Sequence, residues 1–112
     1  MNMLDMMGMM GKIKDVQANI QKTKDSLVHL THIAESGAGL VKVTVNGKRQ
    51  IISLEVDNSL QQPSEYTTMK DLIIAASNKA IAEMDAIIAT EMKKATEGIL
   101  PNIPGLDLGN LL

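Results

Sequence analysis

The chain has 112 residues, which fits a single domain with one modest core. It contains one aromatic residue, Tyr66, and no cysteine, which excludes disulfides, thiolate metal sites and nucleic-acid binding through aromatic stacking. The formal charge of −2 gives no overall attraction for phosphates, and no apolar run approaches the ~18 residues that span a bilayer. We therefore expect a cytoplasmic protein without a membrane partner.

The first segment is predicted to be a helix with an apolar seam. Its seam positions recur every seven residues in two registers: Met6, Ile13, Ile20 and Leu27, and Met9, Val16, Thr23 and Leu30. Charges of both signs lie between them, which favours packing on a partner helix over lying on a membrane surface. Gly8 and Gly11 predict that the Met-rich start frays.

An alternation of period two from His29 to Val56 predicts strands. Val41, Val43 and Val45 share one face, as do Ile52, Leu54 and Val56. Asn46-Gly47 between them predicts a two-residue type I′ turn with Gly47 at positive φ. Such a turn would place these pairs opposite each other: Val45 and Lys48, Val43 and Gln50, and Val41 and Ile52.

A third strand is predicted upstream, from about His29 to Glu35, because Ser36-Gly37-Ala38-Gly39 indicates another turn. This turn lacks the Gly-Lys-Ser/Thr ending of a phosphate-binding loop. His29 and His32 would point to opposite faces of the strand, so they could not ligate one metal ion. The result is a three-stranded antiparallel meander.

A long second helix is predicted to begin near Thr67 or Thr68, where Thr68 and Asp71 resemble a capping box, and to end at a Gly98 cap. Its apolar stripe comprises Leu72, Ile73, Ala76, Ala80, Met84, Ile87, Ile88 and Met92. The fold class is therefore α+β, in the order α-β-β-β-α over residues 1–100. Residues 101–112 form a tail that is either mobile or docked through Leu106, Leu108, Leu111 and Leu112.

Two further expectations follow from this outline. The long seam and thin core predict a homodimer, because a small sheet cannot cover so much apolar surface. The thirteen acidic residues are scattered, and no nucleophile elbow is present, so we expect no enzyme, small-molecule substrate, cofactor or metal.

The run ESGAGLVKVTVNG, from Glu35 to Gly47, resembles the central signature of the YbaB/EbfC family of nucleoid-associated proteins. Further matches are Glu55-Val56-Asp57, Ser59-Leu60, Asp71-Leu72, Ala75-Ala76, Asn78 and Ala80, and the resemblance extends from about Gly11 to Gly98. It implies a bacterial homodimer whose strands assemble centrally and whose helices project like the arms of tweezers. Such a dimer would bind double-stranded DNA with weak sequence preference, help to organise the nucleoid and modulate gene expression.

The resemblance makes the basic residues of the helices the candidates for DNA contacts: Lys12, Lys14, Lys22, Lys24, Lys79, Lys93 and Lys94. Lys22 matches a lysine of the family, whereas relatives often carry a basic pair at the positions of Ala82 and Glu83. Lysine lacks the planar fork that reads guanine, so contacts to phosphates are expected. The alternative is a protein-interaction module, or an accessory factor in replication or recombination, that uses the Met- and Leu-rich surface.

Overall fold

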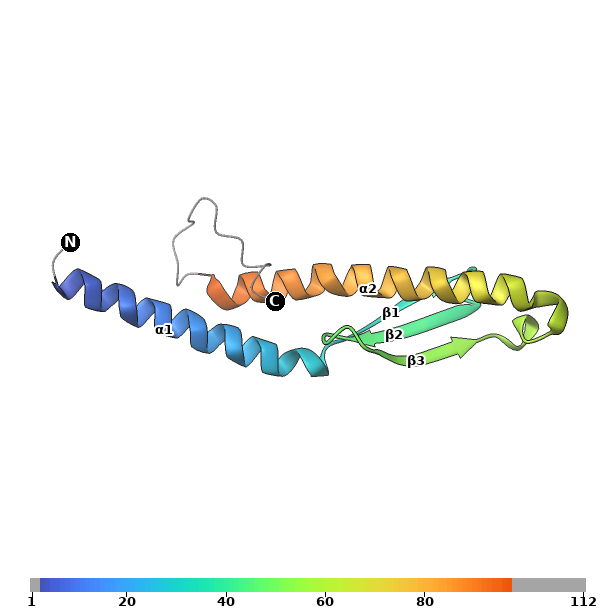
Figure 1. The fold of residues 1–112 in the computed structure, drawn as a ribbon, viewed down its shortest axis with the longest axis horizontal. Helices are drawn as coiled ribbons and strands as arrows, with labels where there is room; N and C mark the ends of the chain where they lie inside the picture. Colours follow the sequence, from blue (N-terminus) through green and yellow to red (C-terminus); the bar gives the residue numbers. More distant parts are fainter. Residues whose placement is uncertain (1–2, 98–112) are drawn as a thin grey trace. The chain divides into compact units, whose positions relative to one another are not determined.

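The structure, a computed structural model, describes residues 3–97 (Figure 1). Its elements are α1 (Met3–Ser26), η1 (Leu27–His29), β1 (Thr31–Ser36), β2 (Val41–Asn46), β3 (Ile51–Val56), η2 (Asn58–Leu60), η3 (Pro63–Glu65) and α2 (Tyr66–Thr96). The predicted α-β-β-β-α order is confirmed. Neither helix in this part of the chain has the length and apolarity needed to cross a bilayer.

The described residues form two compact units, and α2 contributes to both. The helical unit comprises residues 3–26 and 88–97, and the sheet unit comprises residues 27–87. The core of both is aliphatic, as the composition predicts, with Met84 and Met92 among its largest buried side chains.

The sheet unit is an antiparallel meander in the order β1-β2-β3. Val41, Val43 and Val45 are fully buried on one face, and Ala34 lies beside Val43 on that face. The part of α2 within this unit lies along the same face, where the hydroxyl of Ser36 donates to the carbonyl oxygen of Leu72 at 2.6 Å. The predicted alternation of β2 therefore marks the side of the sheet that packs on the helix.

The connection between β2 and β3 differs from the predicted two-residue turn. The N–H of Arg49 donates to the carbonyl of Asn46 and the N–H of Asn46 to that of Gln50, both at 3.0 Å, so residues 47–49 form a three-residue loop. Arg49 has the left-handed φ, 62°, and Gly47 does not. This is the hairpin in which a left-handed residue follows a type I turn and a bulge restores pairing.

The register of the hairpin changes accordingly. Val43 lies opposite Leu54 and Val41 opposite Val56, so the predicted pairings with Gln50 and Ile52 are wrong. The side chain of Asn46 explains the difference, because its Oδ1 accepts the N–H groups of Lys48 at 2.9 Å and Gln50 at 3.1 Å. These bonds stabilise a longer loop than the Asn-Gly pair predicts. Despite the change of register, Val41 and Val43 of β2 still lie on the same face of the sheet as Leu54 and Val56 of β3.

Gly47 is required for a different reason from the predicted one. Its N–H donates to the carbonyl oxygens of Leu27 and Leu30, each at 3.0 Å, so its backbone lies directly against η1. A Cβ at this position would collide with the carbonyl oxygen of Leu27. Close approach of two backbone segments, and not a positive φ, therefore selects glycine here.

Two predicted boundaries move by a few residues. His29 lies in η1, and β1 starts at Thr31, so the two histidines do not share a strand. The helix α2 starts at Tyr66 because η3 leads directly into it, so Thr68 lies inside the helix and the predicted capping box is wrong.

Before η3, Asp57 caps η2 by accepting the N–H of Ser59 at 2.9 Å, and this hydrogen bond lowers the pKa of the Asp57 carboxyl.

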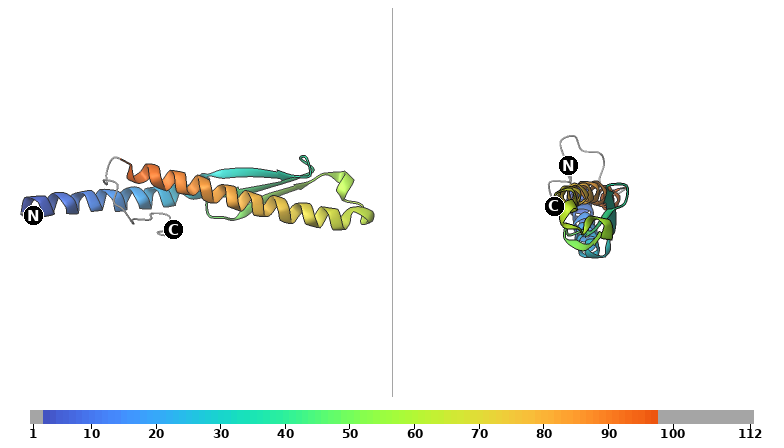
Figure 2. Two further views of the ribbon diagram at one scale, coloured as in Figure 1. Left: turned by 90° about the horizontal axis from the view of Figure 1, so that it is seen from above. Right: turned by 90° about the vertical axis from the view of Figure 1, so that its right-hand side faces the viewer.

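In the helical unit, α1 runs without a break through Gly8 and Gly11, so the fraying predicted there is not seen from Met3 onward. Val16 is buried on α1, and Ile88, Met92 and Thr96 are buried on α2. Figure 2 shows the last turns of α2 beside the middle of α1. Residues 3–15 of α1 are exposed. The predicted Gly98 cap and the tail 101–112 lie outside the described residues.

Candidate nucleic-acid interface

The candidate lysines gather in the helical unit. It holds six of the seven: Lys12, Lys14, Lys22, Lys24, Lys93 and Lys94. The described residues of this unit include six lysines and five acidic residues, which gives a formal charge of +1. The sheet unit has five basic and seven acidic residues, which gives a formal charge of −2. The net negative charge of the chain therefore hides an uneven distribution that favours the helical unit for phosphate contacts.

Some of the basic side chains form ion pairs within the described residues, and others do not. The only arginine, Arg49, binds Asp85 of α2 with its Nε 2.6 Å from the carboxylate. Lys42 lies 3.9 Å from Glu35, and Lys94 lies 3.5 Å from Glu91. Within residues 3–97 no ion pair involves the remaining candidates, which are Lys12, Lys14, Lys22, Lys24, Lys79 and Lys93.

The candidates on α1 do not share one face. Successive residues of a helix are about 100° apart, and the buried Val16 marks the covered side of α1, which we call the packing side. Lys14 and Lys22 then lie on the outward side, whereas Lys24 is partly buried near the packing side. Asp15 and Asp25 are interspersed on that outward side, which limits how many phosphates it can neutralise.

On α2, Lys93 and Lys94 are exposed, and at about 100° per residue Lys93 lies on the flank of the side that carries the buried Met92 and Thr96, whereas Lys94 lies nearly opposite to it. The remaining candidate, Lys79, is an exposed α2 residue that belongs to the sheet unit and not to the helical unit.

Position 83, where relatives often carry a basic residue, has a structural partner in this chain. Glu83 places Oε1 3.2 Å from Nε2 of His32 on β1, and both side chains are partly buried. The acidic residue therefore belongs to the contact between α2 and the sheet. The sequence gives no signal for this pair, because 51 residues separate its members.

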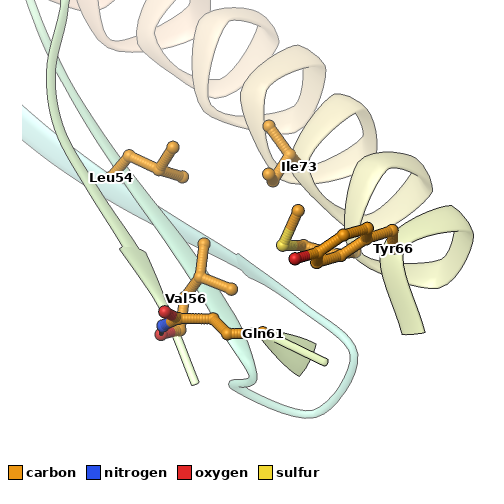
Figure 3. Close-up of a pocket in the computed structure, with 6 residues that line it drawn as sticks. Leu54, Val56, Gln61, Tyr66 and Ile73 are labelled. Atoms are coloured by element: carbon orange, nitrogen blue, oxygen red, sulfur yellow. Dashed lines mark hydrogen bonds between the residues drawn. The ribbon is translucent and has the colours of Figure 1, made fainter. Parts of the chain in front are cut away.

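The sheet unit has an apolar edge that sequence reasoning did not single out. Ile51, Ile52 and Leu54 of the edge strand β3 are each about half exposed. Beside them an open groove of about 580 Å³ is lined by Leu54, Val56, Gln61, Tyr66, Met69 and Ile73. Figure 3 shows Leu54 and Val56 of β3 across the groove from Ile73 and Tyr66 of α2. The sequence feature that could have indicated this surface is the apolar alternation of β3, because β3 lies at the edge of the sheet.

The described residues 3–97 thus form a helix–meander–helix domain of the α+β class whose helices carry lysines without an ion-pair partner. The family model of the YbaB/EbfC DNA-binding family matches residues 1–99. The chain belongs to this family.

Individual relatives agree with this assignment. A protein of Brucella ovis called nucleoid-associated protein is 42% identical over 106 residues, which cover 95% of this chain and 98% of the relative. A Brucella anthropi protein of the same name is 41% identical over equal shares. The crystal structure of uncharacterized protein HP0035 from Helicobacter pylori has a similar fold, with a TM-score of 0.60 and 21% identity over 78% of this chain and 88% of the other.

Proposed function

We propose that this protein binds duplex DNA as a homodimer, through lysine–phosphate contacts of its helical unit and with weak sequence preference. It is a nucleoid-associated DNA-binding protein of the nucleoid in the cytoplasm. The observation that carries the proposed mode of binding is the gathering of unpaired lysines in the helical unit. The domain that acts comprises residues 1–100, and the proposed role is not enzymatic.

The chemistry of the available cations supports phosphate contacts over base reading. An arginine can form two parallel hydrogen bonds to guanine, but Arg49 is held by Asp85. The free cations are all lysines, which bind phosphate as point charges without regard to sequence.

Binding should depend on salt only moderately, because few lysines face outward and acidic residues lie among them. We expect the affinity for several unrelated 30-base-pair duplexes to be similar and to fall with a log–log salt slope of roughly 3 to 5 in magnitude. Fluorescence anisotropy at a series of salt concentrations measures both properties. Absence of binding at low salt, or a strong preference for one duplex, would contradict the proposal.

The apolar edge supports the homodimer. An exposed apolar edge strand is prone to uncontrolled pairing, and natural proteins cover or charge it. Ile51, Ile52 and Leu54 leave this edge apolar, and the groove beside it adds Tyr66 and Met69. A second copy that covers β3 and the groove would bury this surface and bring two helical units into one DNA-binding particle.

A charge in this surface should separate the protomers. We expect the parent protein to have about twice the chain mass in light scattering at micromolar concentration, and Leu54→Lys to have the mass of one chain. Ile33→Lys is the matched control, because Ile33 is also about half exposed but lies on β1 at the other edge. The interface is elsewhere if Leu54→Lys stays dimeric or if the control dissociates equally.

A further inference from the structure

The start of α1 presents an apolar face that no described residue covers. We call Met3, Met6, Met7, Met10 and Ile13 the methionine face. Each of these side chains is between 48% and 79% exposed. At about 100° per residue they occupy roughly a third of the helix circumference, next to the side of α1 on which Val16 is buried. An apolar stripe of this kind usually marks a docking surface.

The position of the α2 end indicates what can reach this face. Thr96, the last residue of α2, is buried, and Figure 2 shows the last turns of α2 beside the middle of α1. The chain continues for residues 97–112, which can span about 50 Å when extended. Met3 lies only about 20 Å along α1 from Val16. The remaining chain is therefore long enough to run the whole length of the methionine face.

The composition of residues 98–112 matches such a surface. This segment contains a single charged side chain, Asp107, and seven apolar ones: Ile99, Leu100, Ile103, Leu106, Leu108, Leu111 and Leu112. Segments that stay solvated are typically rich in charge and poor in aliphatic residues, the opposite composition. Proline is unfavourable inside a helix, so the sequence of this segment, with Pro101 and Pro104, favours an irregular apolar partner, to which methionine side chains adapt well.

We propose that residues 99–112 dock in an extended conformation along the methionine face of α1, so that the two ends of the chain form one apolar cluster. The segment starts within reach of its site, which gives it a high effective concentration over any separate molecule. The proposal is independent of DNA binding. It assigns the methionine face to the chain itself instead of to a second copy, a partner protein or a membrane.

Disulfide trapping tests the proposal directly, since the chain has no cysteine. We expect the double variant Met10→Cys/Leu108→Cys to form an intrachain disulfide under mild oxidation at least about tenfold faster than Asp15→Cys/Leu108→Cys. Asp15 is exposed on the same helix but lies away from the methionine face. Non-reducing gels and peptide mass spectrometry identify the bond. Equal rates in the two variants would overturn the proposal.

Two further experiments test whether a second copy of the chain or a membrane covers the methionine face instead. Rapid chain-to-chain coupling of Met10→Cys alone would assign the face to a second copy, and cosedimentation of the full chain with phosphatidylglycerol vesicles would assign it to a membrane surface. Either result overturns the proposal.

Hydrogen exchange provides a readout that needs no cysteine. Truncation after Gly98, or Leu106→Ser/Leu108→Ser, should speed amide exchange in residues 3–13 at least about tenfold while the amides of β2 stay protected. Unchanged exchange in both variants would equally contradict docking.

Discussion

Gly47→Ala is expected to destabilise the protein by about 2 to 4 kcal/mol, a large fraction of the stability of a domain of this size. The added methyl group collides with the carbonyl oxygen of Leu27, and any movement that relieves the collision lengthens the hydrogen bonds from Gly47 to Leu27 and Leu30. Neither partner can yield easily, because both are backbone. The change in free energy of unfolding is measured by urea denaturation followed by circular dichroism.

Two control variants test whether the collision with η1 causes the loss of stability. Gly11→Ala adds the same methyl group where nothing lies within 4 Å, and it should stabilise α1 by about 0.5 to 1 kcal/mol. Gly47→Asn separates the two explanations for the glycine, because asparagine tolerates a positive φ but would still collide with Leu27. If Gly47→Asn is as stable as the parent, the turn is the type I′ turn predicted from the sequence and the close approach to η1 is wrong.

Lys14→Glu/Lys22→Glu should reduce the affinity for unrelated duplexes by about 100-fold at low salt and flatten the salt dependence. Both lysines face outward on α1 without an ion-pair partner among residues 3–97, and a dimer would lose four such contacts. Fluorescence anisotropy gives the affinity, and light scattering verifies that the dimer remains intact. Adding Lys24→Glu should have a smaller effect, because Lys24 is partly buried near the packing side.

The matched control is Lys48→Glu/Lys70→Glu. It changes the net charge by the same amount, and both lysines are exposed and unpaired within the described residues, but they belong to the sheet unit. We expect a much smaller loss of affinity in this variant. If both double variants weaken binding equally, total charge and not the helical unit governs binding.

The order of elements could be predicted because periodicity reports burial. Val41, Val43 and Val45 alternate on β2, and Ala80, Met84 and Ile88 recur at helical spacing on α2, and all six are buried as expected. The hairpin register could not be predicted, because it depends on where the Asn46 amide side chain bonds and on how closely the loop approaches η1.

The candidate site was predicted less completely. The lysines could be named from the resemblance, but their availability depends on contacts between residues far apart in the sequence. Arg49 meets Asp85 across 36 residues, and His32 meets Glu83 across 51. The apolar edge was missed because an alternating strand looks the same in the middle of a sheet and at its border.

The distribution of methionines also determines which parts of the protein are susceptible to oxidation. Thioether sulfur is converted to the polar sulfoxide most readily where solvent reaches it. Met3, Met6, Met7, Met9 and Met10 are at least half exposed on α1, whereas Met84 and Met92 are almost fully buried. Peroxide should therefore spare the core and attack the first turns of α1 whenever residues 99–112 leave the methionine face uncovered. Oxidation there would make the start of α1 polar and weaken the docking of that segment while the fold persists, and methionine sulfoxide reductases reverse it.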